Sequence, residues 1–189
     1  MTNLLDPEER DAALRLLSST RKVRAPGSSK SVAIAVSTDP LGSWRLAAVA
    51  AWLVRLIAGR FGNSLRDRTD DPAMAHHVLR EARRALGVTG ARYARELLHL
   101  ATLATPEGPG DARAAACRWG ERQPHFDTWL VIDSGIELLR FLSDLSAIQA
   151  GGDVAGDDLT RDAVLDAVSA ELIERDLADI ATIDGEDEQ

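Results

Sequence analysis

The sequence predicts an all-α protein, a single-domain multi-helix bundle with about seven helical segments. The chain has 189 residues, of which 45% are apolar, so it can bury one sizeable core. Apolar residues recur at steps of three and four along most of the chain, which is the helical period. Residues that typically start or stop helices divide these stretches at short intervals. The helical periodicity and the positions of these capping and breaking residues agree, which favours a bundle of several helices.

The first 20 residues are expected to form an N-terminal helix. Asp6 can accept hydrogen bonds from the free amides of a first turn, and Pro7 suits the first helical position because its fixed φ angle is already helical. Residues 21–42 follow as a basic linker rich in turn-forming residues. Within it, residues 32–36 (VAIAV) carry β-branched side chains at every second position, which is typical of a strand. A short extended segment is therefore possible there, although a lone strand has nothing to pair with.

Residues 43–183 are expected to form the helical bundle itself. Within them, residues 46–58 are strongly apolar, but about 13 residues are too few for a membrane span, which needs roughly 20. This stretch therefore predicts a buried helix. Thr128 begins a longer apolar pattern that predicts a helix to about Gln149. The other expected helices start near Ser43, Pro72, Thr89, Asp111 and Thr160, and Gly87 is expected to end the one that starts near Pro72.

The last expected helix, from Thr160 to Ile183, is strongly amphipathic. Asp and Glu dominate one face, and the other face carries an apolar stripe that must be buried somewhere. We expect this stripe to pack partly on the chain's own bundle and partly on a partner, as a helix in a groove. Residues 184–189 should form an acidic, disordered tail. The stripe consists of Val164, Leu165, Val168, Leu172, Ile173, Leu177 and Ile180.

Charge is divided unevenly within an overall net charge of −8. Residues 21–100 carry 14 basic and 6 acidic groups, whereas residues 101–189 carry 6 basic and 20 acidic groups. Either the two parts meet within the fold, or each faces a partner of opposite sign. The basic part makes nucleic-acid binding a further alternative, although no recognition helix, stacking platform or zinc-finger spacing accompanies it. Its arginines are Arg45, Arg55, Arg60, Arg66, Arg68, Arg80, Arg83, Arg84, Arg92 and Arg95.

Four residues on two neighbouring expected helices predict a metal site as an alternative. Glu96 and His99 stand three residues apart, which places a carboxylate and an imidazole on one helical face, as in metal sites held by helical bundles. His77 and Glu81 stand four apart on the preceding helix and could add two more ligands. The sequence supplies only one such Glu-x-x-His motif, and a di-metal bundle needs two. The corresponding function is a metal-dependent bundle enzyme.

No motif indicates a cofactor or a catalytic nucleophile. The sequence lacks Gly-x-Ser-x-Gly, the P-loop pattern and the dinucleotide pattern, so no cofactor is expected and no catalytic residue is identified. The single cysteine, Cys117, cannot form a disulfide within the chain, which together with the lack of a secretory signal favours the cytoplasm. The four tryptophans, at positions 44, 52, 119 and 129, are expected to pack in the core, with a ligand cavity lined by them as the less common outcome.

Together these observations favour a non-enzymatic helical interaction protein that binds another macromolecule. The contact element is expected to be the acidic C-terminal helix, and the partner another protein or a second copy of the chain. No membrane partner is expected, because no segment is long and apolar enough to enter a bilayer. Enzymatic activity is left open by the sequence.

Overall fold

The chain is all-α throughout the part that the structure, a computed structural model, describes. This part comprises residues 5–36, 41–60, 72–123, 126–149 and 158–186, with side chains in the last segment described for residues 161–175. No strand is present in these residues, so the predicted fold class is confirmed. The helices are α1 (Pro7–Lys22), α2 (Ser29–Val36), α3 (Ser43–Arg60), α5 (Pro72–Leu103), α6 (Ala112–Arg122), α7 (Thr128–Gln149) and α8 (Asp158–Glu186).

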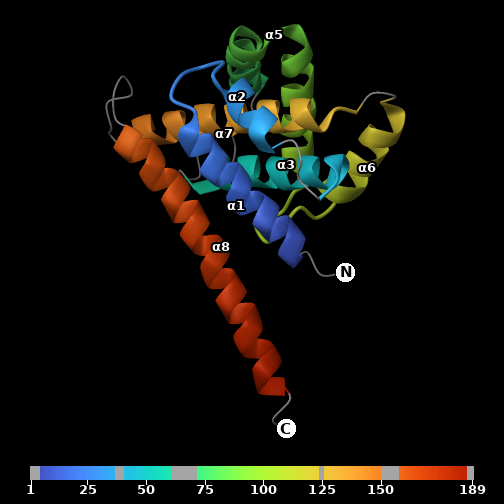
Figure 1. The fold of residues 1–189 in the computed structure, drawn as a ribbon, viewed down its shortest axis with the longest axis vertical. Coiled ribbons are helices and arrows are strands. Elements are labelled where there is room, and N and C mark those ends of the chain that lie inside the picture. Colours follow the sequence, from blue (N-terminus) through green and yellow to red (C-terminus); the bar gives the residue numbers. More distant parts are fainter. Residues whose placement is uncertain (1–4, 37–40, 61–71, 124–125, 150–157, 187–189) are drawn as a thin grey trace.

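Helix α7 lies at the centre of the bundle and contacts α1, α2, α3, α5 and α8. All residues from Val131 to Arg140 are buried, because other helices cover α7 on every side. Helix α3 packs closely against it at Gly135, where an added Cβ would lie 3.3 Å from the Cβ of Ala50. Two small residues at the crossing allow the two backbones to approach. Helices α1 and α8 run side by side across this pair (Figure 1).

Helix α3 contains the apolar stretch 46–58, and its burial confirms the expected buried helix. Every residue from Leu46 to Val54 is buried, with Trp52 at 0% exposure in the middle of the core. The charged exception, Arg55, is only partly buried. Among the described residues, no helix combines the length and the apolarity that crossing a bilayer requires.

Helix α1 begins with the cap that the sequence predicts. The Oδ1 atom of Asp6 accepts from the Glu9 amide at 2.9 Å, and Glu9 in turn accepts from the Asp6 amide at 3.3 Å. This reciprocal pair satisfies two of the free donors of the first turn. Glu9 is also 1% exposed and receives two bonds from Arg113 of α6, at 2.9 and 2.5 Å. Glu9 therefore also joins α1 to α6.

A break at Gly87 divides the long helical run α5 into two parts. Gly87 has φ 74° and ψ −170°, in the left-handed region that favours glycine. The two helices expected to start near Pro72 and Thr89 are therefore both present, with Gly87 between them as predicted.

The possible extended segment at 32–36 is wrong, because these residues belong to helix α2 within the expected linker. Carboxylates of α7 explain the helix. Glu137 accepts from the amides of Gly27 and Ser29, at 2.8 and 3.4 Å, and Asp133 accepts from the Ser29 hydroxyl at 2.6 Å. Negative charge at the start of a helix satisfies its free amides and opposes its dipole. Val32 packs against the core and α2 lies against α7, so the segment needs no strand partner.

A buried polar chain continues from Glu137 to helix α8. Arg140 donates to Glu137 at 3.0 Å and to Asp144 at 2.6 Å, and Arg161 of α8 lies 3.7 Å from Asp144. Arg140 is 7% exposed and Arg161 3%, so these charges depend on one another for compensation. The chain of contacts ties α2, α7 and α8 together.

The basic and acidic parts of the sequence meet at the surface of α8. Arg21 pairs with Asp166, and Arg24 lies 3.9 Å from Asp162. Part of the charge segregation is therefore compensated within the fold. Helix α8 continues to Glu186, so residues 184–186 are helical, which corrects the expected disordered tail. The rest of that tail, residues 187–189, lies outside the described residues.

Replacing Asp133 with Asn is expected to stabilise the protein at about pH 7. Asp133 is 5% exposed, and burial raises the pKa of its carboxyl above the ordinary value of 3.8, while the Ser29 hydrogen bond opposes this shift. The folded state thus binds the proton more readily than the unfolded state. Above the raised pKa, ionised Asp133 lowers the free energy of unfolding. This loss shrinks as the pH falls below the raised pKa and is gone below the pKa of the unfolded state. Asn keeps an acceptor for Ser29. Melting temperatures of both proteins measured from about pH 4 to about pH 8 should therefore converge at the acid end, and a gap that widens there would contradict the assignment.

Candidate functional site

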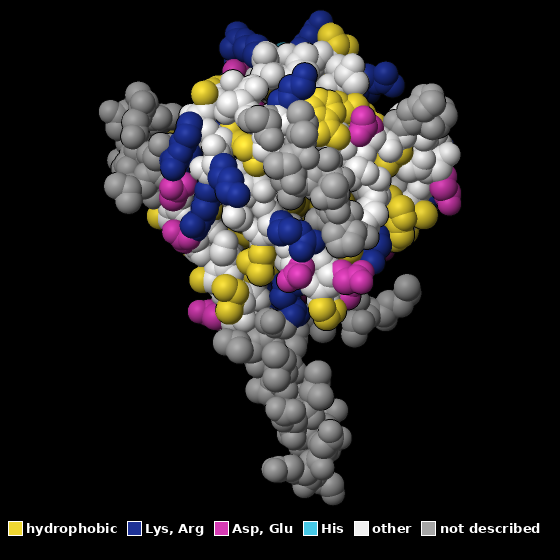
Figure 2. Space-filling view, viewed as in Figure 1, with side chains coloured by type: hydrophobic (Ala, Val, Ile, Leu, Met, Phe, Trp, Pro, Cys, Tyr) yellow, Lys and Arg dark blue, Asp and Glu magenta, His cyan; other side chains and the backbone are white. Residues whose placement is uncertain are grey.

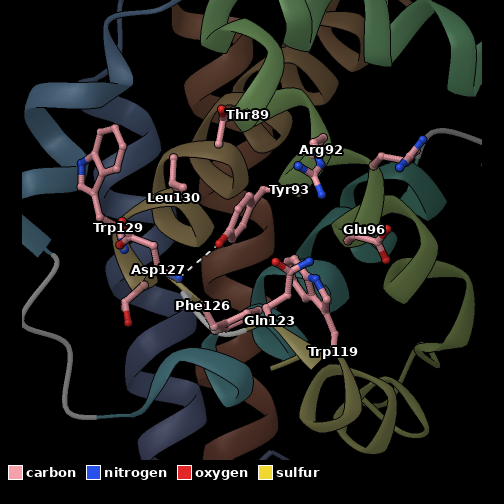
Figure 3. A pocket seen from close by; sticks show the side chains of 12 residues that line it. Thr89, Arg92, Tyr93, Glu96, Trp119, Gln123, Phe126, Asp127, Trp129 and Leu130 are labelled. Carbon is pink, nitrogen blue, oxygen red and sulfur yellow. Dashed lines mark hydrogen bonds between the residues drawn. The ribbon is translucent and has the colours of Figure 1, made fainter. Parts of the chain in front are cut away.

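A cavity of about 770 Å³ opens between α5, α6 and the start of α7. This volume lies within the range of small-molecule sites, roughly 300–1,000 Å³. Tyr93 stands at its centre, with Arg92 and Glu96 on one side and Asp127 and Trp129 on the other (Figure 3). The remaining lining residues are Thr89, Arg95, Trp119, Gln123, Phe126, Thr128 and Leu130. We call this space the aromatic cavity.

Three rings from three separate segments form the apolar wall of the aromatic cavity. The ring centroids of Tyr93 and Trp119 lie 5.3 Å apart at an interplanar angle of 60°, and those of Trp119 and Phe126 lie 4.6 Å apart at 86°. These edge-to-face contacts place the positive edge of one ring on the negative face of the next. Tyr93 and Trp119 are 7% and 6% exposed, so the wall is held rigidly by packing.

The first turn of α7 is fixed to α5 at the cavity. The Asp127 amide donates to the Tyr93 hydroxyl at 3.2 Å, and the Asp127 carboxylate accepts from the Trp129 amide at 2.9 Å (Figure 3). The second bond is an ordinary helix cap, because it satisfies a free amide of the first turn. The Nζ atom of Lys30 lies 5.7 Å from the centre of the Trp129 ring, a cation–π distance.

The charged groups of the cavity lie close to one another without pairing. Arg92 and Arg95 are exposed, and Glu96 is partly buried, all on the second part of α5. Within the part of the chain that the structure describes, none of the three makes an ion pair or a side-chain hydrogen bond. Their charges are therefore available to a molecule that enters the cavity.

Buried indole nitrogens at the cavity also lack acceptors. The Nε1 atoms of Trp119 and Trp129 are buried, and neither has a hydrogen-bond partner among the described residues. A buried N–H without an acceptor costs free energy, so the packing of the two rings must offset this cost.

The first pair of predicted metal ligands is engaged in other contacts. His77 Nδ1 lies 2.8 Å from the guanidinium of Arg80, and the His77 ring packs edge-on against Phe141 with centroids 5.5 Å apart. Glu81 accepts from Arg84 at 2.8 Å. Both side chains thus already have partners on their own helix part or on α7.

The second pair, Glu96 and His99, lies beyond the break at Gly87. Glu96 lines the aromatic cavity, whereas His99 is exposed. Among the described residues, which include all four predicted ligands, no three His, Cys, Asp or Glu side chains are grouped so that they could hold a metal ion. The structure therefore does not bring the four together.

The tryptophans divide between the core and the cavity. Trp52 is a core residue, as expected, and Trp44 is 37% exposed. Trp119 and Trp129 line the cavity, the outcome that the sequence left as less common. Sequence reasoning did not identify Tyr93 or Phe126 as their neighbours. A usable signal was present, since Tyr93 is the single tyrosine and aromatic residues make up only 4% of the chain.

Helix α8 is the second candidate, because it is only partly covered by the bundle. Val164, Leu165, Val168 and Leu172 are buried, whereas Ile173 is 51% exposed. The C-terminal part of the helix extends away from the body of the molecule as a single rod (Figure 1). The side chains of the last two stripe residues, Leu177 and Ile180, lie outside the described residues.

Several of the described arginines of the middle segment are paired with acidic side chains and so do not contribute to an open basic surface. Arg45 bonds to Glu8 at 2.9 Å and to Asp6, and Arg84 is paired with Glu81. On the face drawn in Figure 2, basic side chains occupy several separate places, with acidic side chains beside many of them. The exposed members without an ion pair to a described residue are Arg83, Arg92 and Arg95. The side chains of Arg60, Arg66 and Arg68 lie outside the described residues.

No protein-family model, no curated protein and no solved structure matches this chain.

Proposed function

We propose that this protein is a non-enzymatic interaction protein that binds another protein through the part of α8 that extends beyond the bundle. One observation supports this most directly. The apolar stripe of α8 is buried as far as Leu172, but Ile173 is 51% exposed, and the C-terminal part of the helix extends away from the body (Figure 1). The sequence continues the stripe with Leu177 and Ile180, so the same face has apolar residues left for a partner.

The acidic residues of α8 indicate which charge the partner should carry. Glu174, Asp176 and Asp179 follow in the extending part, against a single basic residue, Arg175. Arg175 itself bonds to Glu171 and to the carbonyl of Pro106, so its charge is partly used. The partner should therefore offer an apolar groove with basic residues at its rim, and association should weaken as salt increases.

The cellular compartment proposed for this function is the cytoplasm. Cys117 is the single cysteine of the sequence, so the fold uses no intrachain disulfide. Proteins of reducing compartments typically have this property.

Removing residues 176–189 is expected to abolish association while leaving the fold intact. The buried part of the stripe remains in place, so the melting temperature should stay within about 2 °C of that of the full chain. Association is tested in cells with a photo-crosslinking side chain at position 173, where the native side chain is 51% exposed. One defined protein adduct is expected in the full chain and none in the truncated chain.

A matched control places the same crosslinker at Val88, which is 63% exposed in α5 and far from α8 in the contact pattern. An adduct specific to position 173 supports the proposal, and its mass distinguishes a foreign protein from a second copy. Sedimentation of the purified chain at low and high salt checks the second copy independently. If no specific adduct forms and the chain sediments as a monomer at every concentration, the proposal is wrong.

A further inference from the structure

We propose that the aromatic cavity binds a small planar aromatic molecule carrying one negative charge. The inference is independent of the role of α8, because the two features lie on different helices. The volume of about 770 Å³ admits a fused-ring molecule of modest size. The ring and the charge of the ligand each match a separate observation in the cavity.

The apolar wall favours a flat ring. Tyr93, Trp119 and Phe126 pack edge-to-face and present a rigid aromatic surface, so a planar molecule gains contact without any rearrangement of the wall. An aliphatic molecule of the same size would lose the interaction between ring faces and ring edges. Aromatic ligands should therefore bind more tightly than saturated ligands of equal charge.

The unpaired arginines set the sign of the charge. Arg92 and Arg95 are exposed at the cavity and make no ion pair with a described residue, so they can meet an anion at little cost. Asp127, which caps α7, is a second acidic residue of the cavity, but it lies on the opposite side of Tyr93 from Arg92 and Glu96 (Figure 3). On the α5 side, two cations stand against one carboxylate, so a ligand with a single negative charge is favoured there, and removal of Glu96 should strengthen its binding.

Calorimetric titration of the full chain tests the proposal with naphthoate as the probe. Naphthoate is expected to bind with a Kd of about 1 mM or tighter, as its small number of atoms allows. Cyclohexanecarboxylate, an aliphatic anion, and naphthylmethylammonium, an aromatic cation, should each bind at least about tenfold more weakly. Quenching of tryptophan fluorescence should follow naphthoate binding and become weaker in Trp119→Phe, which keeps a ring but removes one of the two indoles that line the cavity.

Substitutions of the charged residues at the rim test how each charge contributes to naphthoate binding. The double variant Arg92→Gln, Arg95→Gln should weaken naphthoate binding about tenfold or more, and Glu96→Gln should strengthen it by about threefold. The matched control is Arg83→Gln, which removes an exposed arginine of α5 that does not line the cavity and should leave Kd unchanged within about twofold. Equal loss in Arg83→Gln, equal binding of the aromatic cation, or no binding of naphthoate up to about 5 mM would each overturn the proposal.

Discussion

Deleting the whole of α8, residues 158–189, is expected to lower the free energy of unfolding by about 6 kcal/mol or more. Val164, Leu165, Val168 and Leu172 are buried against the bundle, and burial of each large side chain contributes about 1.5–3 kcal/mol. Domains are typically stable by only about 5–15 kcal/mol, so the shortened chain should be near its unfolding transition at room temperature. Urea denaturation followed by circular dichroism measures the difference directly.

Two point variants on the same helix make this expectation sharper. Val168→Asp places a carboxylate where the native side chain is 0% exposed, so it should cost several kcal/mol. Ile173→Asp makes the same kind of change where the side chain is 51% exposed and should cost about 0.5 kcal/mol or less. If both variants, or neither, lower the urea midpoint, the division of α8 into a buried part and an extending part is incorrect.

The helical period of the sequence predicted most of the fold because burial and period are physically linked. Helix α7 begins at Thr128 and ends at Gln149, as its apolar steps predicted. Asp6 and Gly87 also act as predicted, since a cap and a left-handed turn depend on local chemistry that a sequence displays directly. What determines these features lies within a few residues of them.

The segment 32–36 could not be assigned from its own residues, because distant residues determine its structure. Its β-branched pattern is typical of a strand. The start of α2, however, is bonded to Asp133 and Glu137, which lie about one hundred positions further along the chain. Such long-range contacts override a local preference of well under 1 kcal/mol per residue. The predicted metal site depends on long-range structure in the same way. The break at Gly87 sets how the pair His77 and Glu81 lies relative to Glu96 and His99, and the spacing within each pair carries no information about it.

The aromatic cavity shows how much of a site a single sequence can predict. The sequence predicted that the four tryptophans pack in the core and left a cavity lined by them as the less common outcome, and Trp119 and Trp129 do line one. Their grouping with Tyr93 and Phe126 depends on where α5, α6 and the start of α7 meet. No spacing along the chain encodes that meeting, because it is a property of how the helices pack.

Replacing Glu137 with Ala is expected to lower the free energy of unfolding by about 3–5 kcal/mol. Glu137 is 2% exposed and accepts from the Gly27 and Ser29 amides as well as from Arg140. Its removal leaves donors at the start of α2 without an acceptor. It also leaves the buried Arg140 with Asp144 as its one remaining ion-pair partner among the described residues. Both losses are costly, because neither group can be solvated without opening the bundle.

Glu137→Gln separates these two losses. Glutamine keeps an oxygen that can accept from the α2 amides but lacks the charge that compensates Arg140, so the loss of stability should fall between those of the native chain and Glu137→Ala. Hydrogen exchange of the α2 amides should accelerate in Glu137→Ala and remain near native in Glu137→Gln, because their acceptor is retained. The control is Asp11→Ala, whose exposed ion pair with Arg15 at 3.6 Å should contribute less than about 1 kcal/mol. Equal exchange in both Glu137 variants would show that the carboxylate does not hold α2, and α2 would then owe its helical form to packing on α7 alone.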